Sequence, residues 1–139
     1  MKDVLIELGL DAQDGKDVRE DIILVHNGSH FVFEVKGLTK SAGEKDINQL
    51  QAKKMQYEQE NKVKAKGVLI VNAWRELPLE DRNTPDHPIF PNQMMVMTNI
   101  WEFCLMTTQQ LFVLYCMKLE KVFKLNEFLL KLNRNWNIE

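Results

Sequence analysis

The sequence has little cysteine and no long apolar run, and each shortage excludes a class of protein. Its two cysteines, Cys104 and Cys116, lie in apolar surroundings without CxxC or Cys/His spacing, which predicts reduced core thiols and no zinc site. No apolar run approaches the roughly 18 residues that a membrane-spanning helix needs. The N-terminal stretch MKDVLIELGLD also lacks the apolar segment and cleavage site of a signal peptide. We therefore expect a cytoplasmic protein that does not enter a membrane.

Proline is scarce and confined to one segment. All four prolines lie within residues 74–91, which predicts a long loop, and such loops usually have a function or contact a partner. The length of 139 residues suits one domain, 1–139, with a core motif region (1–73), this loop, and a C-terminal strand and helices (92–139). Because the first predicted helix starts at the initiator Met and is short, we also consider that the natural protein has a longer N-terminal helix or an upstream domain. The chain would then be a fragment.

The net charge of -2 conceals two segments of opposite sign. Acidic residues outnumber basic ones over residues 1–35, whereas lysines outnumber acidic residues over residues 36–66. A solvated charged face explains this pattern about as well as a phosphate-binding surface does. The sequence pI of about 5.9 argues against a dedicated high-affinity DNA-binding protein.

Apolar periodicity predicts helices and strands in the order α-β-β-β-α-β-α-β-α-α. The predicted elements are a helix over 2–8, a short strand after it, strands over 20–26 and 29–37, a helix over 41–60, a strand over 66–73, a helix over 92–101, a strand over 103–107, and helices over 108–119 and 121–136. Ser41 is expected to cap the 41–60 helix, with Glu44 at capping-box spacing. The run VLIV within 66–73 is apolar on both faces, so this strand should lie in the middle of a sheet. This order predicts an α/β fold with a mixed central sheet flanked by helices.

The stretch EDIILVHNGSHFVFEVKG, residues 20–37, predicts a β-hairpin that places two acids face to face. The Asn-Gly pair in its middle is a strong hairpin signal, because both central residues of a type I′ turn need positive φ. With this pair as the loop, Asp21 lies directly opposite Glu34, and Lys36 lies two residues along on the same face. Directly opposed like charges destabilise a sheet, so another group must offset their repulsion.

Two explanations of the opposed acids remain open on the residues alone. In the first, the strand end is exposed and Lys36 neutralises one acid at the edge of the sheet. In the second, the carboxylates of Asp21 and Glu34 hold a divalent cation, because hard cations prefer oxygen ligands and Mg²⁺ is usually bound by one or two carboxylates. A lysine beside such a site can orient an attacking water and stabilise developing negative charge.

This pattern resembles the signature of the PD-(D/E)xK nuclease-like superfamily, also called the restriction-endonuclease-like fold. Members place an Asp at the start of one strand and Glu-x-Lys near the end of the next, here Asp21 and then Glu34-Val35-Lys36. Many members also carry a Gln on the following helix, and this chain has Gln49 in DINQLQ. The α-β-β-β-α-β order that the family implies matches the first half to two-thirds of the chain. The segments EVKG, DINQL and GVLIVN resemble an uncharacterised bacterial branch.

The resemblance implies roles for five residues. Asp21 and Glu34 would ligate Mg²⁺ or Mn²⁺, and the backbone carbonyl of Val35 would complete the protein ligands. Lys36 would position or activate the attacking water, and Gln49 would point at Lys36 or at a phosphate. A surface amide is the alternative for Gln49.

The resemblance further implies a metal-dependent nuclease that hydrolyses DNA phosphodiester bonds, with DNA expected before RNA as the nucleic-acid partner. The alternative is a catalytically inactive nuclease-like module that serves nucleic-acid binding or assembly within a larger protein. Some members take another metal-binding Glu from the first helix; Glu7 lies near that place, although we favour a solvated helix residue there. The apolar C-terminal series between Phe112 and Leu129 would form core or a homodimer interface.

Overall fold

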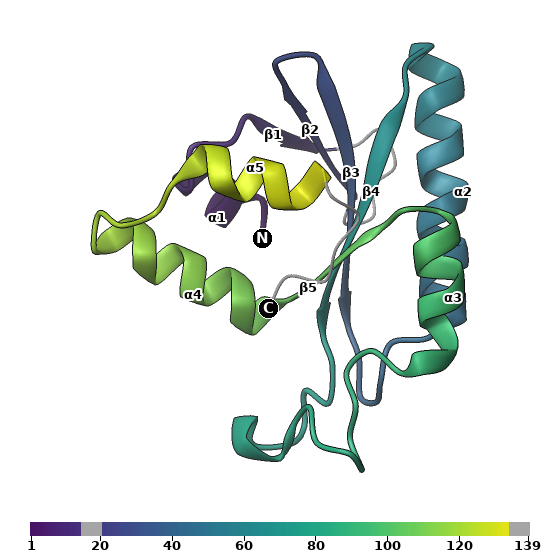
Figure 1. Cartoon of the computed structure of the whole chain (residues 1–139), viewed down its shortest axis with the longest axis vertical. Helices are drawn as coiled ribbons and strands as arrows, with labels where there is room; N and C mark the ends of the chain where they lie inside the picture. Colours follow the sequence, from purple (N-terminus) through teal and green to yellow (C-terminus); the bar gives the residue numbers. More distant parts are fainter. Residues whose placement is uncertain (15–20, 134–139) are drawn as a thin grey trace.

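The chain folds around a five-stranded sheet with helices on both faces (Figure 1). The computed structural model describes residues 1–14 and 21–133. The strands lie side by side in the order β1 (Ala12–Asp14), β2 (Asp21–His26), β3 (Ser29–Gly37), β4 (Ala65–Asn72) and β5 (Cys104–Thr107). The helices are α1 (Lys2–Glu7), α2 (Glu44–Asn61), α3 (Asn92–Ile100), α4 (Thr108–Leu119) and α5 (Leu125–Asn133), with a 3₁₀ turn, η1 (Leu79–Asp81).

The sheet is mixed, because hairpins and helical crossovers build different halves of it. β1, β2 and β3 pair antiparallel, whereas β3, β4 and β5 pair parallel through the crossover helices α2 and α3. Asn27 and Gly28 have φ of 49° and 81°, as the hairpin prediction requires. Asp21 pairs with Glu34 in the predicted register.

Two apolar clusters separate the layers, one on each face of the sheet. The face formed by Phe31, Phe33 and their neighbours packs against α1, α4 and α5. The face formed by Val32, Leu69 and Val71 packs against α2 and α3. Figure 1 shows these two groups of helices on opposite sides of the strands. β4, predicted to be central, lies between β3 and β5, and its residues 68–71 are fully buried.

Two predicted helix starts are wrong, and each has a local cause. α2 begins at Glu44 and not at Ser41, whose hydroxyl instead donates a hydrogen bond to the Pro88 carbonyl at 2.5 Å. The Asp46 carboxylate accepts the Gly43 N–H at 2.9 Å and so performs the capping role predicted for Glu44. The predicted helix over 121–136 begins only at Leu125. Its start is delayed because residue 121 has φ of 63° and the next two N–H groups bond back to α4.

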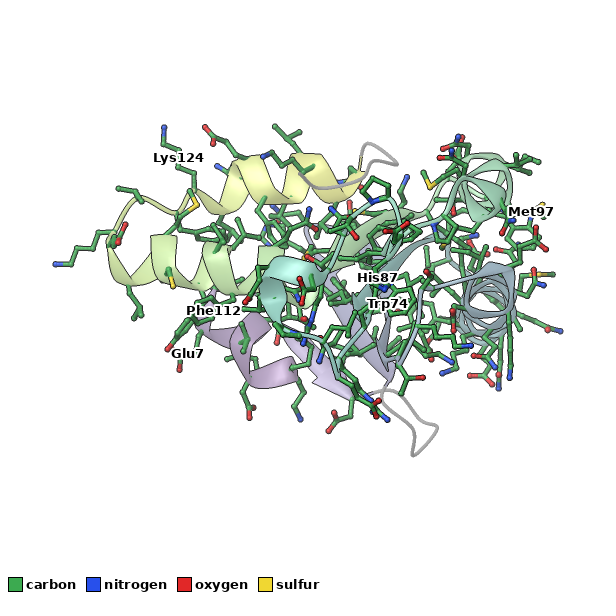
Figure 2. All side chains as sticks on the ribbon, turned by 90° about the horizontal axis from the view of Figure 1, so that it is seen from below. Glu7, Trp74, His87, Met97, Phe112 and Lys124 are labelled. Carbon is green, nitrogen blue, oxygen red and sulfur yellow. The ribbon has the colours of Figure 1, made fainter. Side chains whose placement is uncertain are left out.

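The proline-rich loop is fastened to the connection between β3 and α2. Trp74 follows β4 with φ of 51°, and its indole N–H donates to the Pro88 carbonyl at 3.0 Å. Its ring meets the His87 ring edge-on, with centroids 4.6 Å apart, and Figure 2 shows the two side by side. The N–H of Trp74 bonds the carbonyl of Lys40 at 3.3 Å, and Arg75 bonds that of Leu38 at 3.1 Å. Trp74 therefore packs under the loop, and the loop holds the segment that follows β3.

The far end of α2 is tied to the start of β4. The Glu58 carboxylate accepts hydrogen bonds from the Ala65 N–H at 2.9 Å and from the Lys54 ammonium at 3.0 Å. Burial raises the pKa of Glu58, but these bonds and the nearby lysine charges outweigh it, and the pKa lies below its ordinary value. With both ends of α2 fixed, the helix lies along the face of β3 that carries Glu34 and Lys36.

Both cysteines are free thiols; Cys104 is buried in the sheet and Cys116 is only partly buried. Across residues 1–14 and 21–133, no helix combines the length and apolar character needed to cross a bilayer.

Candidate active site

Glu34 is a buried carboxylate on the face of β3 that α2 covers. Its side chain is 4% exposed, although it lies near the end of the strand. The alternation of β3 directs Phe33 and Val35 to the opposite apolar cluster, and Val32 to the cluster beneath α2. Glu34 therefore sits at the boundary of an apolar core, where a carboxylate must be paired. The first of the two explanations of the opposed acids, which placed them at an exposed strand end, therefore does not describe Glu34.

Lys36 lies two residues beyond Glu34 on the same face and faces three polar groups. Its ammonium lies 3.7 Å from Glu34 Oε1 and 3.7 Å from Asp46 Oδ1. It also donates a hydrogen bond to Gln49 Oε1. The Lys36 side chain is 23% exposed, so it is held by the protein and still reached by solvent.

α2 supplies three polar side chains to the site from one face of the helix. Asp46, Gln49 and Lys53 are spaced by three and four residues, which places them on adjacent turns. Asp46 and Gln49 contact Lys36, and Lys53 donates to Glu34 Oε2. The buried residues Ile47 and Leu50 anchor the helix to the sheet beside them. Apolar packing thus fixes the height at which α2 presents its polar side chains to β3.

Charges alternate through the site. Lys53, Glu34, Lys36 and Asp46 follow one another as cation, anion, cation and anion, each within ion-pair distance of the next. The two carboxylate oxygens of Asp46 have different partners. Oδ1 faces the Lys36 ammonium, and Oδ2 accepts the hydrogen bond from the Gly43 N–H that caps α2. Such a network orients Lys36 and can hold an anion, a cation or a polarised water at the carboxyl end of β3.

The other two predicted metal ligands, Asp21 and Val35, lie on β2 and β3. Asp21 is paired with Glu34 across β2 and β3, but its side chain lies outside the described part of the chain. Val35 follows Glu34 on β3, and its side chain packs on the opposite face of the sheet. Glu7 is exposed on α1, on the opposite side of the sheet from α2 (Figure 2), so it lies away from Glu34.

The histidines of the hairpin lie at its turn end. His26 contacts Asn27 at 3.3 Å, and His30 Nδ1 shares a hydrogen bond of 2.7 Å with the Tyr57 hydroxyl. His26 pairs with Ser29 beside the turn, at the end of the ladder opposite the Asp21 and Glu34 pair. They are turn and packing residues in this fold.

Asp46 and Lys53 belong to the site although the sequence did not assign them to it. Their spacing from Gln49 could have identified them. A helix that presents Gln49 to Lys36 also presents Asp46, three residues earlier, and Lys53, four residues later, on the same side.

A divalent cation fits this donor set under one condition. Within the described residues, no three or more His, Cys, Asp or Glu side chains gather as a metal-binding group. Mg²⁺ needs fewer, because one or two carboxylates suffice when waters and substrate phosphates complete its octahedron. Glu34 provides one carboxylate, and Asp21 occupies the position directly opposite it. The condition is that the Glu34 carboxylate exchanges at least part of its lysine contacts.

Comparison with known proteins identifies the fold. No protein-family model matches the chain, and no match was found among curated proteins. The fold is similar to that of restriction endonuclease FokI, with a TM-score of 0.53 and 11% sequence identity over 99% of this chain. The match spans 27% of the FokI chain. The chain thus has a restriction-endonuclease-like fold, which confirms the predicted α/β class with a mixed sheet flanked by helices.

Proposed function

We propose that the chain is a metal-dependent nuclease that hydrolyses DNA phosphodiester bonds. The observation that carries this proposal is the position of the Lys36 ammonium, which is held by Glu34, Asp46 and Gln49 at the carboxyl end of β3. The same strand end has Asp21 in register with Glu34. A restriction-endonuclease-like fold supports a nuclease by analogy, since fold alone does not define chemistry.

In the proposed site, Asp21, Glu34 and the Val35 carbonyl hold Mg²⁺ or Mn²⁺. When bound, the ion supplies Lewis acidity toward a phosphate oxygen and lowers the pKa of a coordinated water. Lys36 donates a hydrogen bond from Nζ to one lone pair of the attacking water, which orients the other lone pair toward phosphorus. Gln49 fixes the direction of Lys36, so it is a positioning residue.

In the hydrolysis, the water oxygen forms a bond to phosphorus and releases one proton to solvent. The bond from phosphorus to one ester oxygen breaks, and that leaving oxygen takes up a proton from solvent. Lys36 contributes further by stabilising the negative charge that grows on the phosphate oxygens, an effect that is stronger in a partly buried site than in water. The sequence and fold favour DNA over RNA as substrate only through the family resemblance.

The test is cleavage of linear, circular and single-stranded DNA in Mg²⁺, in Mn²⁺ and in EDTA. Wild type should cut in metal and not in EDTA, and both Asp21→Asn and Lys36→Met should lose at least about 100-fold in rate. Lys45→Met removes the same charge from an exposed position in the first turn of α2, and it should keep the wild-type rate. Cleavage that survives Lys36→Met would contradict the proposal.

A second candidate is a catalytically inactive module that uses the fold for nucleic-acid binding or assembly. The observation that favours it is that Glu34, Lys36 and Asp46 already satisfy one another. A chain that neither cleaves DNA nor binds Mg²⁺ or Mn²⁺ by calorimetry, yet binds a DNA duplex, would establish this candidate.

A further inference from the structure

Lys53 lies on α2 but pairs with Glu34, a buried acid on the sheet. It lies in the third turn of α2, and its ammonium donates to Glu34 Oε2 although the residues are 19 positions apart. Its side chain is 27% exposed, whereas that of Glu34 is 4% exposed. One end of the pair is therefore buried in the protein, and the other has access to solvent and to anything that binds there.

The two oxygens of Glu34 face two different lysines. Oε2 accepts from Lys53, and Oε1 lies 3.7 Å from Lys36. Lys53 is hydrogen-bonded to Glu34, whereas Lys36 lies beyond hydrogen-bond distance, so a cation that binds Oε2 must displace Lys53. A doubly charged ion and an ammonium also repel each other strongly at contact distance.

The neighbouring lysine on the same helix does not share this arrangement. Lys54 is paired with Glu58, four residues along α2, at 3.0 Å. Lys53 and Lys54 carry the same charge and lie on the same helix. Both side chains are mostly buried, with 27% and 17% of their surface exposed. Only Lys53 of the two donates to the Glu34 carboxylate in this structure.

We propose that Lys53 exchanges partners during ligand binding; this inference rests on the metal and nucleic-acid binding of the proposed function, and not on cleavage. In the metal-free protein its ammonium neutralises Glu34. With a divalent cation on Glu34, Lys53 swings outward on its flexible stem and binds a phosphate of the nucleic acid. Lysine suits this role because it is a compact charge on four rotatable carbons and needs no fixed bidentate geometry. Metal binding and phosphate binding are thereby coupled through one side chain.

The experiment measures two equilibria and uses Ca²⁺ as the probe. Calorimetry gives the Ca²⁺ affinity of wild type, Lys53→Met, Lys53→Arg and the matched control Lys54→Met. Removal of the competing ammonium should tighten Ca²⁺ binding by about tenfold in Lys53→Met, while Lys53→Arg and Lys54→Met stay near wild type. Fluorescence anisotropy with a labelled DNA duplex, with and without Ca²⁺, gives the coupling. Ca²⁺ should strengthen DNA binding at least about fivefold more in wild type than in Lys53→Met.

The outcomes separate this inference from the proposed function. Equal Ca²⁺ affinities for wild type and Lys53→Met, or no Ca²⁺ binding by either, would overturn the inference even if Mg²⁺-dependent cleavage were found. Tighter Ca²⁺ binding and lost coupling in Lys53→Met, without cleavage of DNA by wild type, would support the inference and overturn the nuclease.

If Lys53→Met fails to fold, the wild-type protein carries the test. The NMR signal of the Lys53 Cε group should move on Ca²⁺ addition toward that of the exposed Lys40, while the Lys54 signal stays in place. An unmoved Lys53 signal at saturating Ca²⁺ would overturn the inference.

Discussion

Glu34→Gln tests whether the buried carboxylate organises the site in the absence of ligands. The substitution keeps the shape of the side chain and removes its charge. Lys36 and Lys53 then lose the anion between them while remaining 23% and 27% exposed. Their mutual repulsion, and the partial burial of both ammoniums, should lower the free energy of unfolding.

The magnitude follows from the distances and the exposure. Two unit charges about 4 Å apart attract by about 4 kcal/mol at an effective dielectric constant of 20, which is a gross value. Removing one partner of a fully buried pair costs about 3–5 kcal/mol, whereas an exposed pair is worth about 0–1 kcal/mol. Glu34 is buried and its lysines are about one-quarter exposed, so we expect a loss of about 2 kcal/mol in the free energy of unfolding.

Urea denaturation without divalent metal is the assay. A loss of about 2 kcal/mol lowers the urea midpoint by about 1 M at an unchanged m-value. The Tm should fall by about 8 °C for a chain of this size. Glu76→Gln makes the same chemical change at an exposed position in the loop and should alter stability by less than about 0.5 kcal/mol.

A double-mutant cycle assigns the loss to the ion pair. Lys53→Met should cost at least about 1 kcal/mol less in the Glu34→Gln protein than in wild type, because its partner charge is already gone. If Glu34→Gln is as stable as wild type, or more stable, the carboxylate is not stabilised by its lysines. The reasoning from burial and contact distance would then be refuted.

Two further predictions concern packing and pH. Gly67→Ala should lose about 1–3 kcal/mol of unfolding free energy in denaturant titration, because its Cβ would lie 2.6 Å from two ring carbons of buried Phe103. Gly43→Ala, whose Cβ meets nothing within 4 Å, is the control and should lose under about 1 kcal/mol; equal losses would contradict the packing argument. Glu58→Gln should cost about 1 kcal/mol at pH 7. The pKa of Glu58 in the folded protein lies below 4.5. The stability difference between wild type and Glu58→Gln should therefore persist above pH 4.5 and vanish as the pH falls through that folded pKa. A stability difference independent of pH would show that the charge is not involved.

Several parts of the fold depend on local chemistry and could be predicted from the sequence. The Asn-Gly turn set the hairpin, and the twofold alternation of strands then placed Asp21 opposite Glu34 with Lys36 on the same face. The apolar run in β4 correctly predicted a central strand, because only a strand covered on both faces can be apolar on both faces. These inferences succeed because they involve neighbours along the chain or a pairing that one turn defines.

Which groups share the site depends instead on tertiary packing. Lys53 meets Glu34 and Asp46 meets Lys36 because α2 crosses over β3 at a height set by buried Ile47 and other apolar residues. No local pattern specifies that height, since it depends on how two apolar surfaces interlock. The start of α2 could not be predicted locally for the same reason, because the Ser41 hydroxyl donates its hydrogen bond to a carbonyl in the distant proline-rich loop. The buried state of Glu34, which makes its lysine partners necessary, is likewise a product of packing between layers and not of sequence spacing.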